Sequence, residues 1–279
     1  MYEAYYRLNA KPFQLSPDPR FFYSSRGHRR AMAYLIYGAS QREGFIVITG
    51  EVGAGKTMLA RMLAQKLEQQ NLVLAQVVST HLDADDMLRM VSAAFGLPEE
   101  KNKAGLLRDL ERYLLALHRQ GKRAVLLVDE AQNLPLAAVE ELRMLSNFQC
   151  AEKSLLQTFL LGQPEFRRTL HGPSLEQLRQ RVLVSCHLGP IDCAETEEYV
   201  THRLRVAGWT GDPAFSEQVF PAIHRYTNGI PRRINLLCDR LLLLGRLDDK
   251  HRFEAEDVAE VIDDFRQESS PLTVHAGGR

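Results

Sequence analysis

The stretch Gly44–Thr57, which reads GFIVITGEVGAGKT, decides the fold of this 279-residue chain. Its first part, Phe45–Thr49, is a short run of mainly β-branched and apolar residues, as in a buried parallel strand. Its second part, Gly50–Thr57, matches the pattern G-x-x-x-x-G-K-[ST], in which a glycine-rich loop lets backbone N–H groups approach phosphate oxygens. An amphipathic helix is predicted from Lys56 to about Gln69. A buried strand, a glycine-rich turn and a helix in this order predict a nucleotide-binding site.

Each residue type in this loop has an expected part in binding phosphates. Gly50, Gly53 and Gly55 keep side chains out of the approach to the backbone N–H groups. Lys56 can reach the β- and γ-phosphates, and the Thr57 hydroxyl can bind Mg²⁺. The positive end of the helix adds to the attraction for anions. The predicted nucleotide-binding residues are therefore Gly50, Glu51, Val52, Gly53, Ala54, Gly55, Lys56, Thr57, Met58 and Asp129.

A second motif, AVLLVDEAQ at Ala124–Gln132, is an apolar strand that ends in two carboxylates. If its carboxyl end lies at the same edge of a parallel sheet as the loop, Asp129 would hold Mg²⁺ through water. Glu130 would then polarise the attacking water. Such a strand end is also compatible with a solvated turn, but the phosphate-binding loop upstream favours the catalytic interpretation.

Polar residues at the ends of two further strands are candidates for acting near Glu130. Gln163, in FLLGQPEF, would point to the same edge and sense the γ-phosphate or orient water. The alternative is a polar residue that only begins a helix. Ser79 and Thr80 close the second strand and would hold Glu130 away from water until a partner binds, although either is also a good N-cap.

The order of elements predicts an α/β fold with a five-stranded parallel sheet flanked by helices. The other four predicted strands are Leu72–Val78, Ala124–Val128, Leu155–Leu161 and Val182–His187. After Pro190 no strand is predicted, only the helices Ala194–Ala207, Ser216–Thr227, Arg232–Leu247 and Ala255–Arg266. The expected parts are an N-terminal arm at 1–26, an α/β domain at 27–190, a helical domain at 191–268 and a disordered tail at 269–279. Prolines exclude a helix from the arm, and its aromatic residues predict that it is ordered.

Composition restricts the classes of function. With 35 basic and 35 acidic side chains the formal net charge is zero, which argues against bulk electrostatic capture of nucleic acid or anionic lipid. No apolar stretch approaches the roughly 20 residues needed to cross a bilayer, and the start lacks the pattern of a secretory signal. The four cysteines have no C-x-x-C spacing, so reduced thiols in a cytoplasmic protein are expected.

Two pairs of arginines are candidates for completing the site. Phosphoryl transfer gains greatly from a guanidinium that reaches the γ-phosphate only in the assembled state. Arg179 and Arg181 precede the fifth strand in LRQRV, and Arg232 and Arg233 begin a helix in GIPRRIN. Each would otherwise be a surface charge, and only its position relative to the motifs distinguishes it.

Together these motifs resemble the AAA+ ATPases of the ExeA/GspA secretion-ATPase group. The similarity covers nearly the whole chain, through MYEAYY, KPFQLSPDPRFFY, GFIVITGEVGAGKT, VDEAQNL, EELRMLSNFQ, LLGQPEF, LRQRV and GIPRRINLLCDRLLL. Within the group, the chain is most similar to the secretion ATPase encoded beside exosortase XrtA in PEP-CTERM systems. The resemblance implies a P-loop NTPase of the AAA+ type, followed by a small all-α lid, with ATP and Mg²⁺ as cofactors.

The resemblance also implies a role for each candidate residue. Gly50–Thr57 would be the Walker A motif, Asp129 and Glu130 the Walker B motif, and Gln163 would lie near sensor 1. Arg181 resembles the arginine finger offered to a neighbouring subunit, with Arg179 as the other choice. The arm around Phe13–Pro17 would line the adenine pocket, and Arg232 would be the sensor 2 arginine. The implied catalytic residues are Glu130, Lys56, Arg181, Gln163 and Arg232.

The function implied by the group is Mg-dependent ATP hydrolysis that powers or regulates assembly or export of cell-envelope polysaccharide or protein. The protein would act as a homo-oligomeric ring, such as a hexamer, with envelope secretion and polysaccharide-export components as partners. It would reach the inner membrane only through those partners. Full-length members of the group continue into a transmembrane segment and a peptidoglycan-binding domain, whereas this chain stops after the lid, so the resemblance implies the ATPase module alone.

The alternative function is a nucleotide-switched binding module that acts on DNA, as in TniB-like transposition regulators and origin-binding initiators. Nucleic acid is not expected as a partner, because Asp239, Asp248 and Asp249 are interleaved with the arginines of the lid and no winged helix fits. A kinase that transfers phosphate to a small acceptor fits poorly, since a glutamate after the Walker B aspartate suits activation of water.

Overall fold

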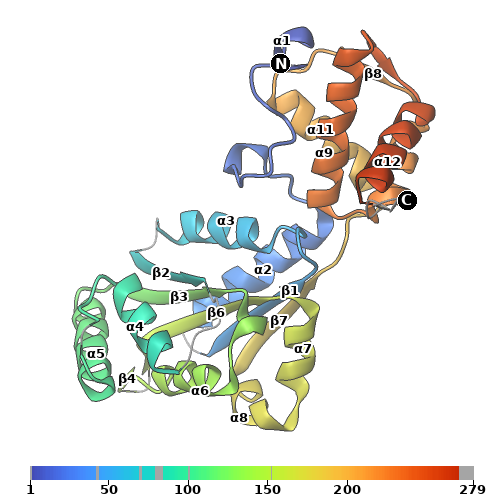
Figure 1. Ribbon diagram of the computed structural model, residues 1–279. Helices are drawn as coiled ribbons and strands as arrows, with labels where there is room; N and C mark the ends of the chain where they lie inside the picture. The colour runs from blue at the N-terminus through green and yellow to red at the C-terminus, as the bar shows by residue number, and fades with distance from the viewer. Residues whose placement is uncertain are drawn as a thin grey trace, which may run out of the picture. The chain divides into compact units, whose positions relative to one another are not determined.

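Figure 1 shows a computed structural model of the chain, which describes residues 2–41, 44–68, 71–78, 84–99, 101–151 and 153–269. The chain forms two compact units. The sheet unit is Arg26–Gly189, and the helical unit combines Met1–Ser25 with Pro190–Arg279. The N-terminal segment therefore packs with the C-terminal helices, although the whole sheet unit separates the two in sequence.

The sheet unit is built, in its described part, on a five-stranded parallel sheet, as the sequence predicts. The strand order is β2-β3-β6-β1-β7. The strands are β1 (Phe45–Gly50), β2 (Leu72–Val78), β3 (Arg123–Asp129), β6 (Leu156–Gly162) and β7 (Val182–Leu188). Because β6 lies between β1 and β3, the carboxyl ends of these three strands are neighbours. The glycine-rich loop, the Asp129–Glu130 pair and Gln163 all lie at that edge of the sheet.

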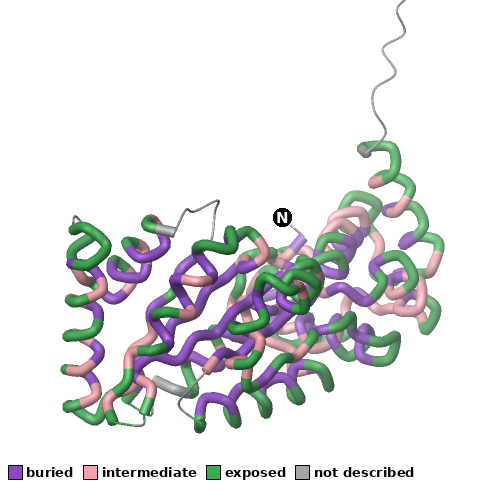
Figure 2. The backbone as a smooth tube through the Cα atoms, turned by 90° about the horizontal axis from the view of Figure 1, so that it is seen from below, coloured by how far each residue is buried: buried purple, intermediate pink, exposed green. Residues whose placement is uncertain are grey.

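Helices cover both faces of the sheet (Figure 1). On one face lie α2 (Arg26–Gln41) and α3 (Lys56–Glu68), and on the other α4 (Ala84–Ala94), α5 (Lys103–Arg119), α6 (Leu136–Leu145), α7 (Pro164–His171) and α8 (Glu176–Arg179). Every residue of β1 and β6 is buried, and the centre of the sheet is mostly purple in Figure 2. This explains why β1 reads as a continuous apolar run, since alternation is lost when both faces are covered.

Several short elements of the sheet unit have no counterpart among the predicted elements. A hairpin pairs β4 (Gln149–Cys150) with β5 (Lys153–Ser154), and its strands are too short to show any periodicity. Helix α7 begins with Pro164 directly after Gln163. Proline is favoured at the first helical position because its missing N–H would have no partner there. Pro164 was therefore a signal in the sequence for the start of α7, and the prediction of helices did not use it.

The helical unit contains, in its described part, α9 (Cys193–Val206), α10 (Val219–Thr227), α11 (Pro231–Leu247) and α12 (Ala255–Ser269), close to the predicted helices. The expectation that no strand occurs here is wrong. Strands β8 (Ala214–Phe215) and β9 (Arg252–Phe253) pair in parallel, and the rings of Phe215 and Phe253 lie 5.5 Å apart. No helix in the described residues is long and apolar enough to span a membrane.

The N-terminal segment contains a short helix where none was expected. Helix α1 (Tyr2–Tyr5) precedes the prolines, and a 3₁₀ turn, η1 (Pro19–Phe21), follows them. Proline disrupts a helix only within its interior, so the prolines leave the first residues unrestricted. Four aromatic side chains of the segment join the core of the helical unit: Tyr2, Tyr6, Phe13 and Phe21. The segment is ordered, as predicted from its aromatic content.

Candidate functional site

The glycine-rich loop connects β1 to α3 and needs its glycines for conformation and for clearance. Gly53 and Gly55 have φ angles of 84° and 96°, in the region that residues with a side chain rarely adopt. A Cβ at Gly55 would lie 2.7 Å from Nε2 of His28, a buried residue of α2. The loop is thus held close to α2 without side chains of its own at these positions. This backbone cradle fits a phosphate group.

Lys56 begins α3 with its ammonium group enclosed by the loop. The side chain is buried, at 6% exposure, and Nζ donates to the carbonyl oxygens of Gly50 at 2.8 Å and Glu51 at 3.1 Å. Burial lowers the pKa of Lys56, and the charges of Glu130 and Asp129 act in the opposite direction. An ammonium has three N–H donors, and the described residues accept from two of them. The group therefore has capacity to bind an anion.

Thr57 and Asp129 bring two oxygen ligands together from different elements. Thr57 Oγ1, in the first turn of α3, donates to Oδ2 of Asp129 at the end of β3, over 2.8 Å. Asp129 is 5% exposed, and its Oδ1 accepts from the backbone N–H of Glu130 at 2.9 Å. A hydroxyl and a carboxylate are ligands that Mg²⁺ prefers. The donor set fits the predicted ion, because Thr57 can keep its hydrogen bond while a lone pair of Oγ1 faces the metal.

Glu130 follows directly and contacts two glutamine side chains. Its backbone has a φ of 54°, and its Oε2 accepts from Nε2 of Gln132 at 2.6 Å. Nε2 of Gln163 lies 3.3 Å from the same oxygen, and the backbone N–H of Gln163 donates to Oε1 of Gln132 at 2.9 Å. The strand register explains the approach, since Gly162 of β6 lies opposite Thr49 of β1. Gln163 therefore emerges between the loop and the two acids.

The two candidate finger arginines lie near the start of β7. Nη1 of Arg181 donates to Oγ of Ser146 at 2.7 Å, and Ser146 follows the last turn of α6. Nη1 of Arg179 donates to the carbonyl oxygen of His171 at 3.1 Å. Both arginines are half-buried. Ser79 and Thr80, the proposed restraints on Glu130, lie outside the described residues.

The remaining candidates belong to the helical unit. Arg232 and Arg233 lie in the first turn of α11, and both side chains are exposed. Phe13 is 1% exposed within the core of the helical unit, so its ring has no free face for a base. Leu15, at 48% exposure, and Pro17 are the exposed apolar side chains of the stretch that was expected to contact adenine.

Sequence reasoning did not assign roles to Gln132 and Ser146. Gln132 stands in the quoted motif AVLLVDEAQ, two residues after Glu130, and the tight 3₁₀ turn η2 (Ala131–Asn133) folds its side chain back to the acid. A signal was therefore present in the spacing. Ser146 carries no such signal, because its contact with Arg181 joins segments 35 residues apart.

Solved structures with a similar fold are known. The ORC2 protein of Aeropyrum pernix, in ADPNP-ADP complexes, is 14% identical with a TM-score of 0.68, and the match covers 94% of this chain and 75% of that one. The Thermotoga maritima RuvB Holliday junction branch migration motor is 18% identical with a TM-score of 0.56, over 85% of this chain and 68% of that one. Residues 39–170 match a family model described as an AAA domain. The fold is that of an AAA+ protein.

One relative has a much higher sequence identity to this chain than these solved structures have. General secretion pathway protein A from Aeromonas hydrophila is 41% identical over 262 residues. The match covers 93% of this chain but 47% of the relative, so the chain spans about half the length of the protein it matches. Together with the AAA domain match, this identity supports a relationship between this chain and the GspA/ExeA-like group of AAA+ proteins.

Proposed function

We propose that this AAA+ protein binds ATP at the loop Gly50–Thr57 and hydrolyses it with Glu130 as general base. The observation that carries the proposal is the hydrogen bond between Thr57 and Asp129, because it joins the end of the phosphate loop to the end of β3. It brings a hydroxyl, two carboxylates and a buried ammonium to one edge of the sheet. That set supplies the ligands and the base that hydrolysis of a nucleoside triphosphate requires.

The chain's own groups would share the work as follows. Lys56 exchanges one or both loop carbonyls for oxygens of the β- and γ-phosphates. Glu130 accepts a proton from water as the water oxygen bonds to the γ-phosphorus. The bond from that phosphorus to the bridging oxygen breaks, and ADP leaves with the electron pair. Mg²⁺, held by Thr57 and through water by Asp129, would neutralise phosphate charge when bound.

The proposal includes assembly of several copies, in a ring such as a hexamer. Arg181 would be offered to the nucleotide of a neighbouring subunit, and Arg232 would act as the sensor 2 arginine of the lid. Among the described residues, the Arg181 guanidinium has one hydrogen-bond partner, the Ser146 hydroxyl, and this supports the proposal, because a guanidinium with five donors keeps most of them for another ligand. Arg179 donates to a backbone carbonyl and is the second choice.

We propose that hydrolysis powers or regulates assembly or export of cell-envelope polysaccharide or protein. The identity to General secretion pathway protein A supports a secretion-related role. The more specific link to exosortase XrtA and PEP-CTERM systems, with polysaccharide-export components as partners, follows from the sequence resemblance. The protein would be cytoplasmic and would reach the inner membrane through those partners.

The deciding experiment compares Glu130→Gln with the wild type. Removing the general base should lower phosphate release by about 10²–10⁴-fold. The dissociation constant for ATP, measured by calorimetry with Mg²⁺, should change little, because Glu130 is not part of the phosphate loop. Full turnover in Glu130→Gln would contradict the assigned base, and the absence of any ATP binding by the wild type would contradict the whole proposal.

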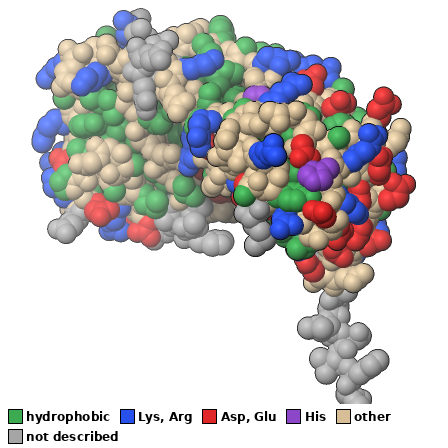
Figure 3. All heavy atoms as spheres, turned by 90° about the horizontal axis from the view of Figure 1, so that it is seen from above, with side chains coloured by type: hydrophobic (Ala, Val, Ile, Leu, Met, Phe, Trp, Pro, Cys, Tyr) green, Lys and Arg blue, Asp and Glu red, His purple; other side chains and the backbone are tan. Residues whose placement is uncertain are grey.

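The alternative, a nucleotide-switched module on DNA, makes a different prediction. Helix α12 carries Glu256, Asp257, Glu260, Asp263, Asp264 and Glu268. Figure 3 shows acidic side chains gathered on one face of the helical unit. Such a face repels phosphate backbones. We therefore expect no binding of duplex DNA at low salt with or without ATP. Affinity that falls steeply with added salt would favour the alternative.

A further inference from the structure

The carboxylate of Glu130 is held by two side-chain amides from different elements. Nε2 of Gln132, in η2, donates to Oε2 at 2.6 Å, and Nε2 of Gln163, after β6, donates to the same oxygen at 3.3 Å. Among the described residues, both side-chain hydrogen bonds to this carboxylate end on Oε2. The other oxygen, Oε1, is therefore the one available to a water molecule.

A third hydrogen bond fixes which way the amide of Gln132 faces. Its Oε1 accepts from the backbone N–H of Gln163 at 2.9 Å. Because a backbone N–H can only donate, the oxygen of this amide has to face Gln163 and its NH₂ group has to face Glu130. The amide orientation is thus determined by its partners. Glu130, Gln132 and Gln163 form a closed set of three hydrogen bonds, which we call the amide clamp.

The backbone conformation of Glu130 also indicates that surrounding contacts hold this residue in place. Its φ of 54° lies in the left-handed region, which is uncommon for residues other than glycine and persists only where surrounding contacts stabilise it. A glutamate side chain also has several rotatable bonds, and its head group is free to move unless other groups hold it. The amide clamp supplies those contacts at the head group.

We propose that Gln132 is a positioning residue for Glu130 and that it couples the position of Gln163 to that of the general base. The inference rests on the proposed function, since it takes Glu130 as the group that accepts the proton of water. Because the two amides hold Oε2 of Glu130, Oε1 points in one fixed direction. Any displacement of the Gln163 backbone by a bound phosphate moves Gln132 through its N–H, and Gln132 moves the carboxylate.

The first test is Gln132→Met, which keeps the length of the side chain and removes its hydrogen bonds. Misplacing the base should lower kcat by about 10–100-fold. The dissociation constant for ATP should stay within about twofold, because the clamp does not touch Lys56 or the loop backbone. Gln65→Met, an exposed glutamine of α3, is the matched control and should leave both values unchanged. Turnover equal to or above the wild type, or a parallel loss of ATP affinity, would overturn the proposal.

The second test uses thermal stability and needs no turnover. Gln132→Glu sets two carboxylates at hydrogen-bond distance, and the melting temperature should fall by about 4 °C. The double variant Glu130→Gln with Gln132→Glu reverses donor and acceptor, so the hydrogen bond between residues 130 and 132 can form again and the melting temperature should recover while turnover stays lost. If the change in melting temperature of the double variant equals the sum of the changes in the two single variants, the proposed amide clamp is wrong.

The outcomes separate the two proposals. If Glu130→Gln retains turnover, the proposed function fails. The melting temperatures of the single and double variants can still show that the amide clamp forms. If Glu130→Gln abolishes turnover and Gln132→Met does not lower it, only the role of Gln132 fails.

Discussion

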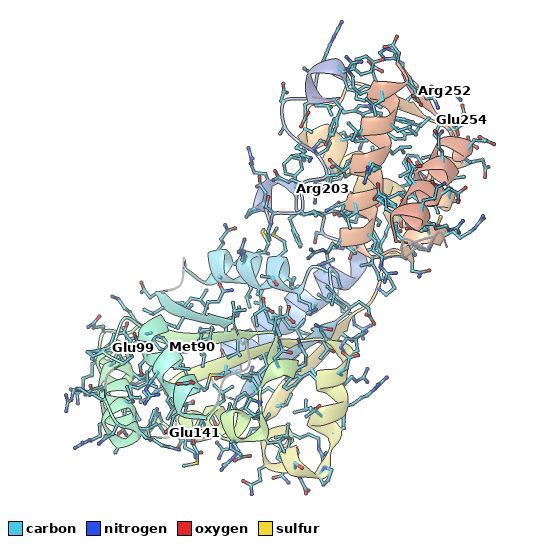
Figure 4. All side chains as sticks on the ribbon, in the orientation of Figure 1. Met90, Glu99, Glu141, Arg203, Arg252 and Glu254 are labelled. Carbon is cyan, nitrogen blue, oxygen red and sulfur yellow. The ribbon has the colours of Figure 1, made fainter. Side chains whose placement is uncertain are left out.

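The sheet unit and the helical unit each bury a cation, and the partners of the two cations differ. Arg203 on α9, labelled in Figure 4, is 8% exposed. Its guanidinium donates to the carbonyl oxygens of Pro12 at 2.6 Å and Gln14 at 3.2 Å and to the hydroxyl of Tyr199 at 3.1 Å. All three nitrogens of the group are used. Lys56, by contrast, contacts two carbonyls of its own loop.

This difference separates a structural cation from a functional one. The partners of Arg203 lie up to 191 residues away in sequence, so the guanidinium fastens the N-terminal segment to α9. The rings of Phe21 and Tyr199 lie 5.1 and 5.6 Å from it. Replacing these contacts would require the segment to detach. The partners of Lys56 are local and can be exchanged for a ligand without unfolding anything. Variants of the two kinds should therefore affect different measurements.

The largest effect is expected for Arg181→Ala, which removes the proposed finger. Turnover per subunit should fall by about 10³-fold, because a guanidinium offered to the γ-phosphate contributes that much in related chemistry. Steady-state phosphate release measured over a range of protein concentrations should also lose its upward curvature. Arg119→Ala, an exposed arginine at the end of α5, is the control. Arg179→Ala decides between the two candidates, and if it alone abolishes turnover, the assignment of Arg181 is wrong.

Lys56→Met should affect binding and leave stability intact. Loss of two charge-assisted hydrogen bonds to phosphate should weaken ATP binding by about 10²–10³-fold in calorimetry. Burial lowers the pKa of Lys56, which means that keeping the ammonium charged at neutral pH costs folding free energy. Replacing it by an apolar side chain of similar length should therefore leave the free energy of unfolding unchanged or raise it. A marked loss of stability would place Lys56 in the same class as Arg203.

Arg203→Met should show the opposite pattern. The carbonyls of Pro12 and Gln14 would lose a buried donor, so the free energy of unfolding should fall by about 2–3 kcal/mol in chemical denaturation. Amide hydrogen exchange should increase at residues 2–21, which the guanidinium holds. Arg205→Met, an exposed arginine on the same helix, is the control and should change stability by less than about 0.5 kcal/mol. Equal effects of the two substitutions would remove the distinction between structural and surface arginines.

The same contrast explains which features the sequence could predict. The signal for β1, the loop and α3 lies within Gly44–Thr57, where each element is specified by adjacent residues. The end of β3 was predicted for the same reason, and the parallel register then brings Gln163 to the two acids. These parts of the site follow from local pattern and from the rule that parallel strands share one carboxyl edge.

The parts that could not be predicted depend on contacts between distant segments. Nothing near Arg203 in sequence indicates that its partners are Pro12 and Gln14, and nothing near Ser146 indicates Arg181. The β8–β9 pair is two residues long and also joins distant segments. Gln132 is the exception, because its contact with Glu130 is local and only the 3₁₀ turn that makes it was not predicted.

The smallest effect is expected where a charged pair is exposed. Asp18, at the start of η1, accepts hydrogen bonds from the side chain and the backbone N–H of Arg20, and these lower the pKa of Asp18 to about 2. A carboxyl whose pKa is lower in the folded state contributes stability above its unfolded pKa, near 4, and loses it as the pH falls toward 2. Asp18→Asn should therefore be slightly less stable than the wild type at pH 6, and the difference should disappear between about pH 4 and pH 2. Urea denaturation of both proteins at pH 6, 4 and 3 measures it. A difference that does not change with pH would mean that Asp18 acts through its capping geometry and not through its charge.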